Sequence, residues 1–466
     1  MATRKAGKKA AAGGGGRGAS AGAAGVSSPI EQLLLAALER GGDANETGRY
    51  LVTFKEGAGT ESLASLGAQG LRVADARDFS GQAGALDEVG DADAFVFPEI
   101  GVALISGDAA QERSLGAFGA EAAADSPFET VEPEPFVFTA ADYGARFGIF
   151  GQGVEEGGGA GGAGEQLRGA ARILEAIARE IGAYGRTPQL EAEEEVAVLG
   201  ATWGLNACRV PPSTRSGAGI RVAVLDTGMD LGHPDFAGRQ FVTASFVGEP
   251  VQDLHGHGTH CIGTACGPKA PPGTTPRYGI GYQTTIFVGK VLTNSGFSVG
   301  SSVLNGMNWA IANNCQVISM SLGGGGGPFA FYTAAGQAAL NKGLLIVAAA
   351  GNNYPGTTLA PANSPTIMSV ASVDQNLAPS NFSAQGKIEI AGPGRDIFSS
   401  VPRPTRYGIK SGTSMATPHV AGCAALWAQT SPLMRGKVLW DRLRATAKAL
   451  PYPVTRVGRG LVQAPA

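Results

Sequence analysis

The apolar pattern between residues 49 and 138 alternates short strand-like runs with helix-compatible, Ala-rich stretches. Helices are predicted at 62–71 and 109–124. The strand-like runs are RYLVTF (49–54), AFVF (94–97), GVALIS (101–106) and TVEPEPFVF (130–138). The order β, α, β, β, α, β over about 90 residues is that of a ferredoxin-like arrangement, so we expect a small α+β unit here.

Beyond Trp203 the apolar runs are continuous, which is typical of strands buried on both faces of a parallel sheet. Helices are predicted between them, notably at 303–313 and 331–342. The predicted strands are IRVAVLD (220–226), TIFVGKVL (285–292), CQVISMSLG (315–323), LLIVAAAG (344–351) and IMSVASV (367–373). This pattern predicts an α/β fold with a doubly wound, mainly parallel sheet, in which chemistry collects outside the carboxyl ends of the strands.

Low-complexity segments precede and separate these two regions. Residues 1–28 form an Ala-, Gly-, Ser- and Lys-rich tail with too few apolar side chains to offset the entropy lost on ordering. Residues 30–40 (IEQLLLAALER) predict a short amphipathic helix. Residues 152–164 have the composition of a flexible Gly-rich linker, and a further helix is predicted near 167–181.

Composition and charge exclude several classes of protein. Of the 466 residues, 43% are apolar and 16% are charged, so most of the chain is expected to be globular. No apolar run reaches the roughly 18 residues of a membrane span, and the net charge of −3 favours neither a nucleic-acid nor a membrane-surface partner. The sign of the charge is divided, since residues 1–200 carry a net −14 and residues 201–466 a net +11.

The cysteines and the N-terminus bear on the cellular compartment. The 5 cysteines are too few for a disulfide scaffold and lack the spacing of a zinc knuckle. The N-terminus is basic but has no apolar core of a secretory signal. We therefore expect a cytoplasmic protein, with export by another route as the alternative.

Three side chains in Gly-flanked motifs have the chemistry of a serine nucleophile and its base. Asp226 ends the predicted strand IRVAVLD, His257 lies in HGTHC at the start of a small-residue helix, and Ser414 begins the predicted helix of SGTSMATPHVAG. A serine nucleophile needs a neutral imidazole, and the imidazole needs a carboxylate that fixes its tautomer. Taken singly, each has an ordinary alternative: an Asp in a turn, a histidine at the edge of a core and a serine N-cap.

Acyl transfer also needs hydrogen-bond donors for the developing oxyanion. Asn352 follows the buried run LLIVAAAG and offers a side-chain amide at the end of that strand. The backbone N–H of Ser414 offers a second donor, at a helix N-terminus. On its own, an Asn in this place is more often a turn residue.

The candidate residues occur in the chain order Asp, His, Ser, which is that of subtilisin. Five motifs follow one another: VLDTGMDLGHPDF, GHGTHCIGT, SMSLGG, VAAAGN and GTSMATPHVAG. With these motifs, residues 203–445 resemble the subtilisin-like serine proteases, and HGTHC is similar to the proteinase K branch. The resemblance implies a serine endopeptidase with Asp226, His257 and Ser414 as its triad and Asn352 as the oxyanion donor.

The resemblance also implies where a peptide substrate binds. One matched segment is the edge strand that pairs with the substrate backbone, and another is the opposite wall of the pocket for the residue before the cut. The matched residues are Ser321, Leu322 and Gly323 on the strand and Ala349, Ala350 and Gly351 on the wall. Because the wall is small and apolar, and no acidic residue stands in the matched segments, the resemblance favours a broad preference for apolar side chains before the cut.

The N-terminal α+β unit resembles the inhibitory pro-segment of these proteases in pattern, although it carries no sharp motif; an unrelated accessory domain is the alternative. The spacer that follows is longer than the family pattern explains and leaves the cleavage point open. The expected division of the chain is a low-complexity basic tail with a short helix (1–47), an inhibitor-like pro-domain (48–140), a Gly-rich linker with a helix (141–200) and a subtilisin-like peptidase domain (201–466).

Metal binding has little support in the sequence. Asp235 matches a carboxylate that many relatives use for calcium, but the Asn-rich loop that completes that site is replaced by GPKAPPGTTPRYG. One carboxylate does not make a calcium site. His255, His257 and His260 with Cys261 are an alternative zinc cluster, but their spacing matches no standard ligand pattern. We therefore expect no cofactor.

The resulting expectation is a self-processing endopeptidase zymogen. Its partners would be protein or peptide substrates and its own pro-segment, which would act as an intramolecular inhibitor, with no nucleic-acid or membrane partner. A dedicated processing protease with one substrate and a catalytically silent metal- or peptide-binding scaffold are the alternatives.

Overall fold

The structure is a computed structural model that describes residues 28–40, 45–55, 64, 66–67, 70–79, 92–112, 128–140 and 200–466. The predictions for the N-terminal tail and for the linker and helix of the spacer concern residues outside these ranges. So do most of the helices predicted at 62–71 and 109–124, although residues 64, 66 and 67 are helical.

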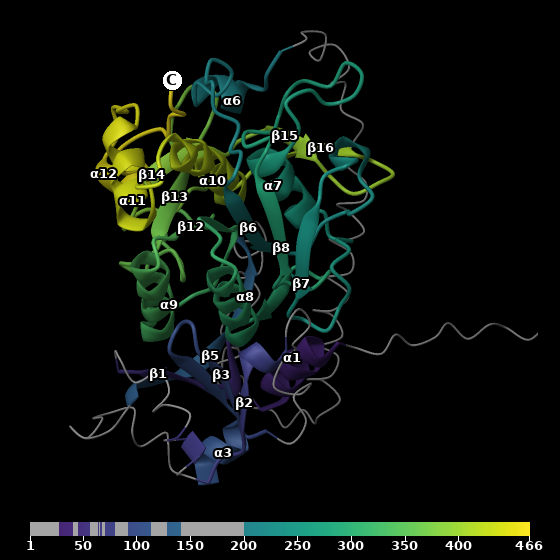
Figure 1. Cartoon of the computed structure of the whole chain (residues 1–466). Coiled ribbons are helices and arrows are strands. Elements are labelled where there is room, and N and C mark those ends of the chain that lie inside the picture. The colour runs from purple at the N-terminus through teal and green to yellow at the C-terminus, as the bar shows by residue number, and fades with distance from the viewer. Residues whose placement is uncertain are drawn as a thin grey trace, which may run out of the picture.

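The N-terminal domain is an antiparallel sheet that lies below the larger domain in Figure 1. Its strands run in the order β5-β1-β4-β3-β2, and β1 is antiparallel to both β4 and β5. This is the predicted ferredoxin-like arrangement, with the short strand β2 added in parallel beside β3. The elements are α1 (Pro29–Arg40), β1 (Glu46–Phe54), β2 (Val73–Asp75), η1 (Ala76–Asp78), β3 (Ala94–Phe97), β4 (Val102–Ile105), α3 (Gly107–Glu112) and β5 (Phe128–Thr139).

The C-terminal domain contains a parallel sheet in the order β14-β13-β12-β10-β6-β8-β7. The five predicted strands form its interior, whereas both edge strands were missed because one is half exposed and the other is short and ends in Gly-Pro. The strands are β6 (Arg221–Asp226), β7 (Phe241–Ser245), β8 (Thr285–Lys290), β10 (Val317–Met320), β12 (Leu345–Ala349), β13 (Met368–Val373) and β14 (Ile390–Pro393).

Helices cover both faces of this sheet, as predicted for a doubly wound fold. In β6, Val222 and Val224 face the core beneath α7 and α10, whereas Ala223 and Leu225 face the core shared with α8 and α9. These helices are α7 (His257–Cys266), α8 (Gly300–Ala312), α9 (Ala330–Asn341) and α10 (Thr413–Thr430). The remaining elements are α6 (Trp203–Ala207), η4 (Pro234–Phe236), β9 (Phe297–Val299), β11 (Leu322–Gly323), β15 (Ile397–Ser400), β16 (Tyr407–Lys410), α11 (Gly436–Thr446) and α12 (Val454–Val457).

The two domains share one apolar core. One face of the N-terminal sheet, including Leu51 and Phe97, packs against α8 and α9, and the other face, including Val52 and Val96, packs on the domain's own helical side. Figure 1 shows α8 and α9 directly above this sheet. Successive side chains along each strand therefore point into two different cores. This explains why β3 and β4 are buried along their whole length.

Among the described residues, none of the helices combines the length and the apolar character needed to cross a bilayer.

Candidate active site

Asp226 and His257 meet at the carboxyl end of the parallel sheet. Asp226 is the last residue of β6, and its carbonyl oxygen accepts hydrogen bonds from the backbone N–H groups of Val291 and Leu292. His257 is the first residue of α7, and its Nδ1 lies 2.7 Å from Asp226 Oδ1. Because a carboxylate can only accept, Nδ1 carries the proton and Nε2 is left as the acceptor. This is the tautomer that a general base requires.

The surroundings of His257 hold its pKa well above the ordinary histidine value. Complete burial by itself would lower the pKa, but the Asp226 carboxylate 2.7 Å away stabilises the imidazolium and outweighs that effect. A carboxylate that stabilises the charged imidazole is what nucleophilic catalysis by serine asks of this position.

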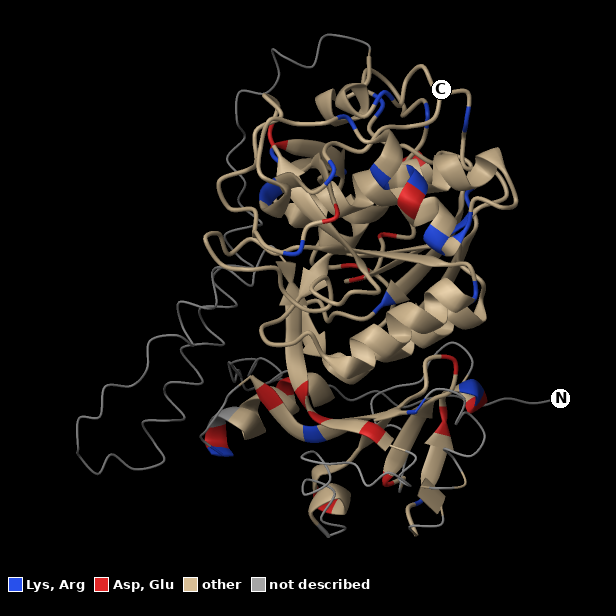
Figure 2. Cartoon of the chain, turned by 90° about the vertical axis from the view of Figure 1, so that its left-hand side faces the viewer, with Lys and Arg blue, Asp and Glu red and all other residues tan. Residues whose placement is uncertain are grey.

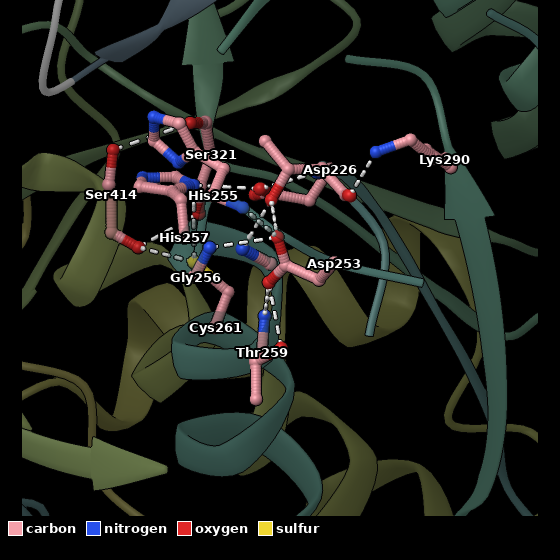
Figure 3. Close-up of polar contacts among 12 residues, drawn as sticks. Asp226, Asp253, His255, Gly256, His257, Thr259, Cys261, Lys290, Ser321 and Ser414 are labelled. Carbon is pink, nitrogen blue, oxygen red and sulfur yellow. Dashed lines mark hydrogen bonds and ion pairs between the residues drawn. The ribbon is translucent and has the colours of Figure 1, made fainter. Parts of the chain in front are cut away.

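Ser414 lies at the start of α10, fully buried, on the other side of His257 from Asp226 in the view of Figure 3. Its hydroxyl donates to the carbonyl oxygen of Ser321 at 3.3 Å. His257 Nε2 is buried and has no hydrogen-bond partner in the described part of the structure. The structure thus forms the Asp226–His257 bond but no hydrogen bond between Ser414 and His257. Catalytic hydrogen bonds are commonly loose before substrate is bound.

A buried carboxylate that the sequence analysis did not single out holds the His257 loop in place. Asp253 Oδ1 accepts from the backbone N–H groups of His255 and Gly256, and its Oδ2 accepts from the N–H and hydroxyl of Thr259. Thr227, next to Asp226, donates its hydroxyl to the same carboxylate and accepts the N–H of residue 258. Figure 3 shows this network beneath His257. The sequence signal that could have identified Asp253 is its position four residues before His257.

Lys290 supports the other side of the Asp226 segment. Its Nζ is fully buried and donates to the carbonyl oxygen of Thr227 at 2.6 Å and to Asn294 Oδ1 at 2.9 Å. Burial lowers the pKa of Lys290, and the nearby Glu249 carboxylate partly offsets that effect. No sequence pattern predicted this contact, because it joins β8 to the loop after β6 only in the folded sheet.

Asn352 presents its side-chain nitrogen to the carbonyl of a residue from the N-terminal domain. Its Nδ2 donates to the carbonyl oxygen of Ala140 at 2.7 Å. Its Oδ1 accepts from both the backbone N–H and the hydroxyl of Thr413, at 2.9 and 3.0 Å. These two bonds fix which end of the amide faces Ala140, so the N–H is available as a donor to a carbonyl in the site.

The end of β5 lies between two strands of the C-terminal domain as a peptide substrate would. It is antiparallel to β11, where Leu322 faces Thr139 and Gly323 faces Phe138, and to β9 on its other side. The backbone N–H of Ala140 donates to the carbonyl oxygen of Ser321 at 3.3 Å. The predicted edge strand therefore pairs with β5, a segment of the same chain. The sequence analysis missed β9 because its three residues, FSV, are too short to carry a strand signal.

The predicted pocket wall lies beside Asn352, the predicted oxyanion donor. Ala349, Ala350 and Gly351 are buried at the end of β12, directly before Asn352. Gly351 has φ +113, and a Cβ there would lie 2.8 Å from a methyl carbon of Leu359. This backbone conformation needs glycine, and it turns the chain so that Asn352 faces the site.

Comparison with known proteins identifies the family. A model described as the subtilase family matches residues 217–460. The chain is 38% identical over 285 residues to an alkaline protease of Alkalihalobacillus alcalophilus, covering 59% of this chain and 73% of that protein. It is 38% identical over 270 residues to subtilisin Savinase of Lederbergia lenta, covering 57% and 97%, and 38% identical over 243 residues to subtilisin E of Bacillus subtilis (strain 168), covering 50% and 62%. The chain belongs to the subtilase family.

This subtilase is a serine endopeptidase, and its parallel sheet, helix layers and Asp226–His257 bond fit that activity. The similarity to the proteinase K branch stays a prediction, since the relatives named above are an alkaline protease and subtilisins.

The residues considered for metals have other partners in this subtilase. Asp235 accepts hydrogen bonds from the hydroxyl groups of Tyr278 at 2.6 Å and Tyr407 at 2.8 Å, which occupy both carboxylate oxygens. His260 Nε2 lies 2.9 Å from the carbonyl oxygen of Ile397, so it carries a proton and is not a free ligand atom. Burial lowers the pKa of His260 well below the ordinary histidine value, so this side chain is neutral. Among the described residues, the ligand-type group that includes His257 does not include His260.

Cys261 lies on α7, one turn beyond His257. Its Sγ is 3.9 Å from His257 Nδ1 and 3.5 Å from the carbonyl oxygen of Ser414. Within the described ranges, Asp226, His257 and Cys261 are the ligand-type side chains that come within reach of a single ion. A direct hydrogen bond already joins two of the three.

Proposed function

We propose that this subtilase is a self-processing zymogen that cuts its own chain after Ala140 and is then inhibited by the product. The observation that carries the proposal is the hydrogen bond of 2.7 Å from Asn352 Nδ2 to the carbonyl oxygen of Ala140. A donor within 2.7–3.1 Å of the oxyanion position is what acyl transfer requires, so this distance supports attack on the Ala140 carbonyl. The pairing of β5 with β11 and β9 supports the same register.

In the proposed reaction, Ser414 Oγ attacks the carbonyl carbon of Ala140, and His257 Nε2 takes the hydroxyl proton. Asp226 keeps His257 in its tautomer and stabilises the imidazolium. Asn352 Nδ2 and the Ser414 N–H hold the oxyanion as the tetrahedral intermediate forms. His257 then gives the proton to the leaving amine, and the same steps with water release the Ala140 carboxylate.

Two carboxylates on β5 support the role of the N-terminal domain as an inhibitor. Glu134 is fully buried, and its Oε1 accepts from the backbone N–H of Ser301 at 2.8 Å, in the first turn of α8. Glu132 accepts from the backbone N–H of Ala330 at 2.9 Å, the first residue of α9. Carboxylates are favourable at helix N-termini because the free N–H groups and the helix dipole stabilise negative charge. The N-terminal domain thus caps two helices of the peptidase.

Glu134 is in turn held by its own domain. Its Oε2 accepts from Arg49 Nε at 2.7 Å and from the hydroxyl of Thr47 at 2.8 Å. A buried ion pair of this kind would leave an uncompensated charge if one partner were removed. Glu134 therefore links the interior of the N-terminal domain, through Arg49 and Thr47, to the first turn of α8.

Helix α1 adds a further contact over the bound strand. Its Ser28 and Glu31 form reciprocal hydrogen bonds of 3.0 and 3.2 Å, a capping box that starts the helix. One face of the helix packs into a cluster with residues of β5 and β9. That face consists of Ile30, Leu34 and Ala37. The predicted amphipathic helix would therefore belong to the inhibitor rather than to a separate tail.

The opposed charges of the two regions support rapid docking. Residues 48–140 carry 5 basic and 16 acidic side chains, against a net +11 for residues 201–466. In Figure 2 most Lys and Arg positions lie in the upper domain, towards the C-terminus, and many Asp and Glu positions lie in the lower one. A direct ion pair across the interface joins Lys342 and Glu99. Attraction over longer distances raises the association rate and is screened by salt.

For other substrates we propose a broad preference for small or apolar side chains directly before the cut, because Ala140 occupies that place and Ala349, Ala350 and Gly351 lie beside Asn352. No metal or organic cofactor enters the proposed reaction.

The test is to express the full chain with Ser414→Ala beside the wild type and a Ser431→Ala control. We expect the wild type and the control to be cut and the first residue of the C-terminal product to be Ala141, by N-terminal sequencing. We expect Ser414→Ala to stay uncut near 47.1 kDa. Equal processing of all three in purified form, or a product that begins elsewhere, would contradict the proposal.

A further inference from the structure

The strand β9 places side chains directly opposite those of the bound strand β5. In the antiparallel register, Phe297 faces Phe138 and Val299 faces Phe136. The rings of Phe138 and Phe297 lie 6.3 Å apart at a tilt of 32°. Directly opposed residues of antiparallel strands are the pairs that interact most, and aromatic pairs are among the most favourable.

The other neighbour of Phe138 contributes no side chain. On the β11 side, Phe138 is opposite Gly323. Between the two neighbouring strands, only β9 therefore offers a side chain at this position. Phe138 is only 6% exposed and belongs to one apolar cluster with Phe297 and Val299, which α1 covers through Ile30 and Leu34. A short peptide substrate lacks α1, but its third residue before the cut would keep the contact with Phe297.

The next residue of β9 faces the other way. Ser298 is opposite Val137, and Val137 packs in the separate core beneath α8 and α9. Alternation along the strand therefore gives β9 one apolar face, Phe297 and Val299, directed at alternate residues of the peptide.

We propose that Phe297 makes this subtilase favour an aromatic residue at the third position before the cut, with Val299 favouring an apolar residue at the fifth. The inference rests on the proposed function, since a cut after Ala140 makes Phe138 the third residue and Phe136 the fifth. The preferred substrates are then peptides that pair with β9 in extended form and carry large apolar side chains at alternate positions, ending in a small residue.

The experiment uses the enzyme that the full chain releases by processing itself, with peptides that carry a fluorophore and quencher around Phe-Val-Phe-Thr-Ala-Ala-Asp, the sequence of residues 136–142. Only the third residue before the cut is changed, from Phe to Ala. We expect kcat/KM to be roughly three- to tenfold higher for the Phe peptide, the size of an aromatic cross-strand pair. A serine-directed fluorophosphonate counts competent active sites in each preparation.

Phe297→Ala should reduce the ratio of the two kcat/KM values to near one, whereas the matched control Ser298→Ala should keep the wild-type ratio. Phe297→Leu, which keeps an apolar side chain without a ring, should give an intermediate ratio and serves where the alanine variant fails to fold. A wild-type ratio near one, or a full ratio in Phe297→Ala and Phe297→Leu, would overturn this inference alone. Failure of titrated wild-type enzyme to cut any of the peptides after the Thr-Ala pair would overturn the proposed function and this inference with it.

Discussion

The side-chain amide of Asn352 donates a hydrogen bond of 2.7 Å to the carbonyl oxygen of Ala140, which lies 212 positions earlier in the chain. Thr413 holds the other end of the amide by two hydrogen bonds, so in the proposed cleavage the donor is already directed at the carbonyl oxygen before charge develops there. Such preorganisation is the main source of oxyanion stabilisation, because no dipole must turn during the reaction.

Replacement of Asn352 by Ala should therefore slow the reaction without unfolding the protein. We expect kcat to fall by about 10² to 10³, the size of the loss when one oxyanion donor is removed from subtilisin. The measurement is kcat on a peptide substrate, with active sites counted by a fluorophosphonate. Asn381→Ala, at an exposed position, is the control. An unchanged kcat would mean that another group serves as the donor.

The raised pKa of His257 predicts the acid side of the pH profile. His257 must be neutral to act as the base, so activity is lost as pH falls through its pKa, and a raised pKa places this loss at a higher pH than for an ordinary histidine. In Asp226→Asn, burial remains but the stabilising charge is gone, so the midpoint should move to lower pH while kcat falls by about 10⁴. The check is the pH dependence of kcat/KM for both proteins; a midpoint that does not move would remove Asp226 as the cause.

The thiol of Cys261 should make the enzyme sensitive to inhibition by mercury compounds. Burial raises its pKa, so the reaction with mercury should be slow, but a metal on Sγ would lie beside His257 Nδ1, 3.9 Å away. We expect mercuric chloride to abolish activity of the released enzyme and Cys261→Ala to be resistant. Cys315→Ala, which removes another buried thiol, should stay as sensitive as the wild type. Resistance of the wild type would place Cys261 out of reach.

Glu132 should make the binding of the N-terminal domain to the peptidase domain depend on pH. Its burial against α9 raises the pKa of this carboxyl, and the N–H of Ala330 offsets that only in part. A carboxyl whose pKa is raised on docking takes up a proton there, so docking weakens as pH rises through the raised pKa. We expect the cut domain to dissociate faster on that rise, as measured by the appearance of activity.

The matched variant is Glu132→Gln, which keeps a side-chain oxygen for the Ala330 N–H without a charge. Its dissociation rate should vary less with pH over the same range, whereas Glu129→Gln, on the same strand, should behave as the wild type. An equal pH dependence in Glu132→Gln would assign the effect to another group.

The two tyrosines on Asp235 predict a stability effect that is independent of added metal. Tyr278→Phe removes a buried donor at 2.6 Å and leaves a carboxylate oxygen unpaired, which should cost about 1–3 kcal/mol of the free energy of unfolding. Urea denaturation with Ser414→Ala as the background measures it without self-digestion, and Tyr452→Phe, at a partly exposed position, is the control. A free energy of unfolding that is equal in Tyr278→Phe and its background would contradict the prediction. So would a loss that appears only when calcium is present and that EDTA abolishes.

The local pattern was sufficient to predict much of this subtilase. The interior strands were found because each is a continuous apolar run, and Asp226, Asn352 and the HGTHC and GTSMA motifs stand at strand ends and helix starts, where backbone geometry is set within a few residues. The ferredoxin-like order also followed from alternation alone. The edge strands β7 and β14 escaped because half exposure and a Gly-Pro end erase that signal.

The sequence by itself therefore determined the interior strands of the parallel sheet, the ferredoxin-like order of the N-terminal domain and the residue types of the candidate site. Only the tertiary structure decided which segments meet: β5 beside β9, Glu134 on the first turn of α8, Lys290 on the carbonyl of Thr227 and Thr413 on Asn352. The reason is physical. Propensity and periodicity act over a few neighbouring residues, whereas these contacts are backbone pairings and buried polar bonds between distant segments, and any of many N–H or carbonyl groups satisfies such a bond equally well until the packed cores fix the register.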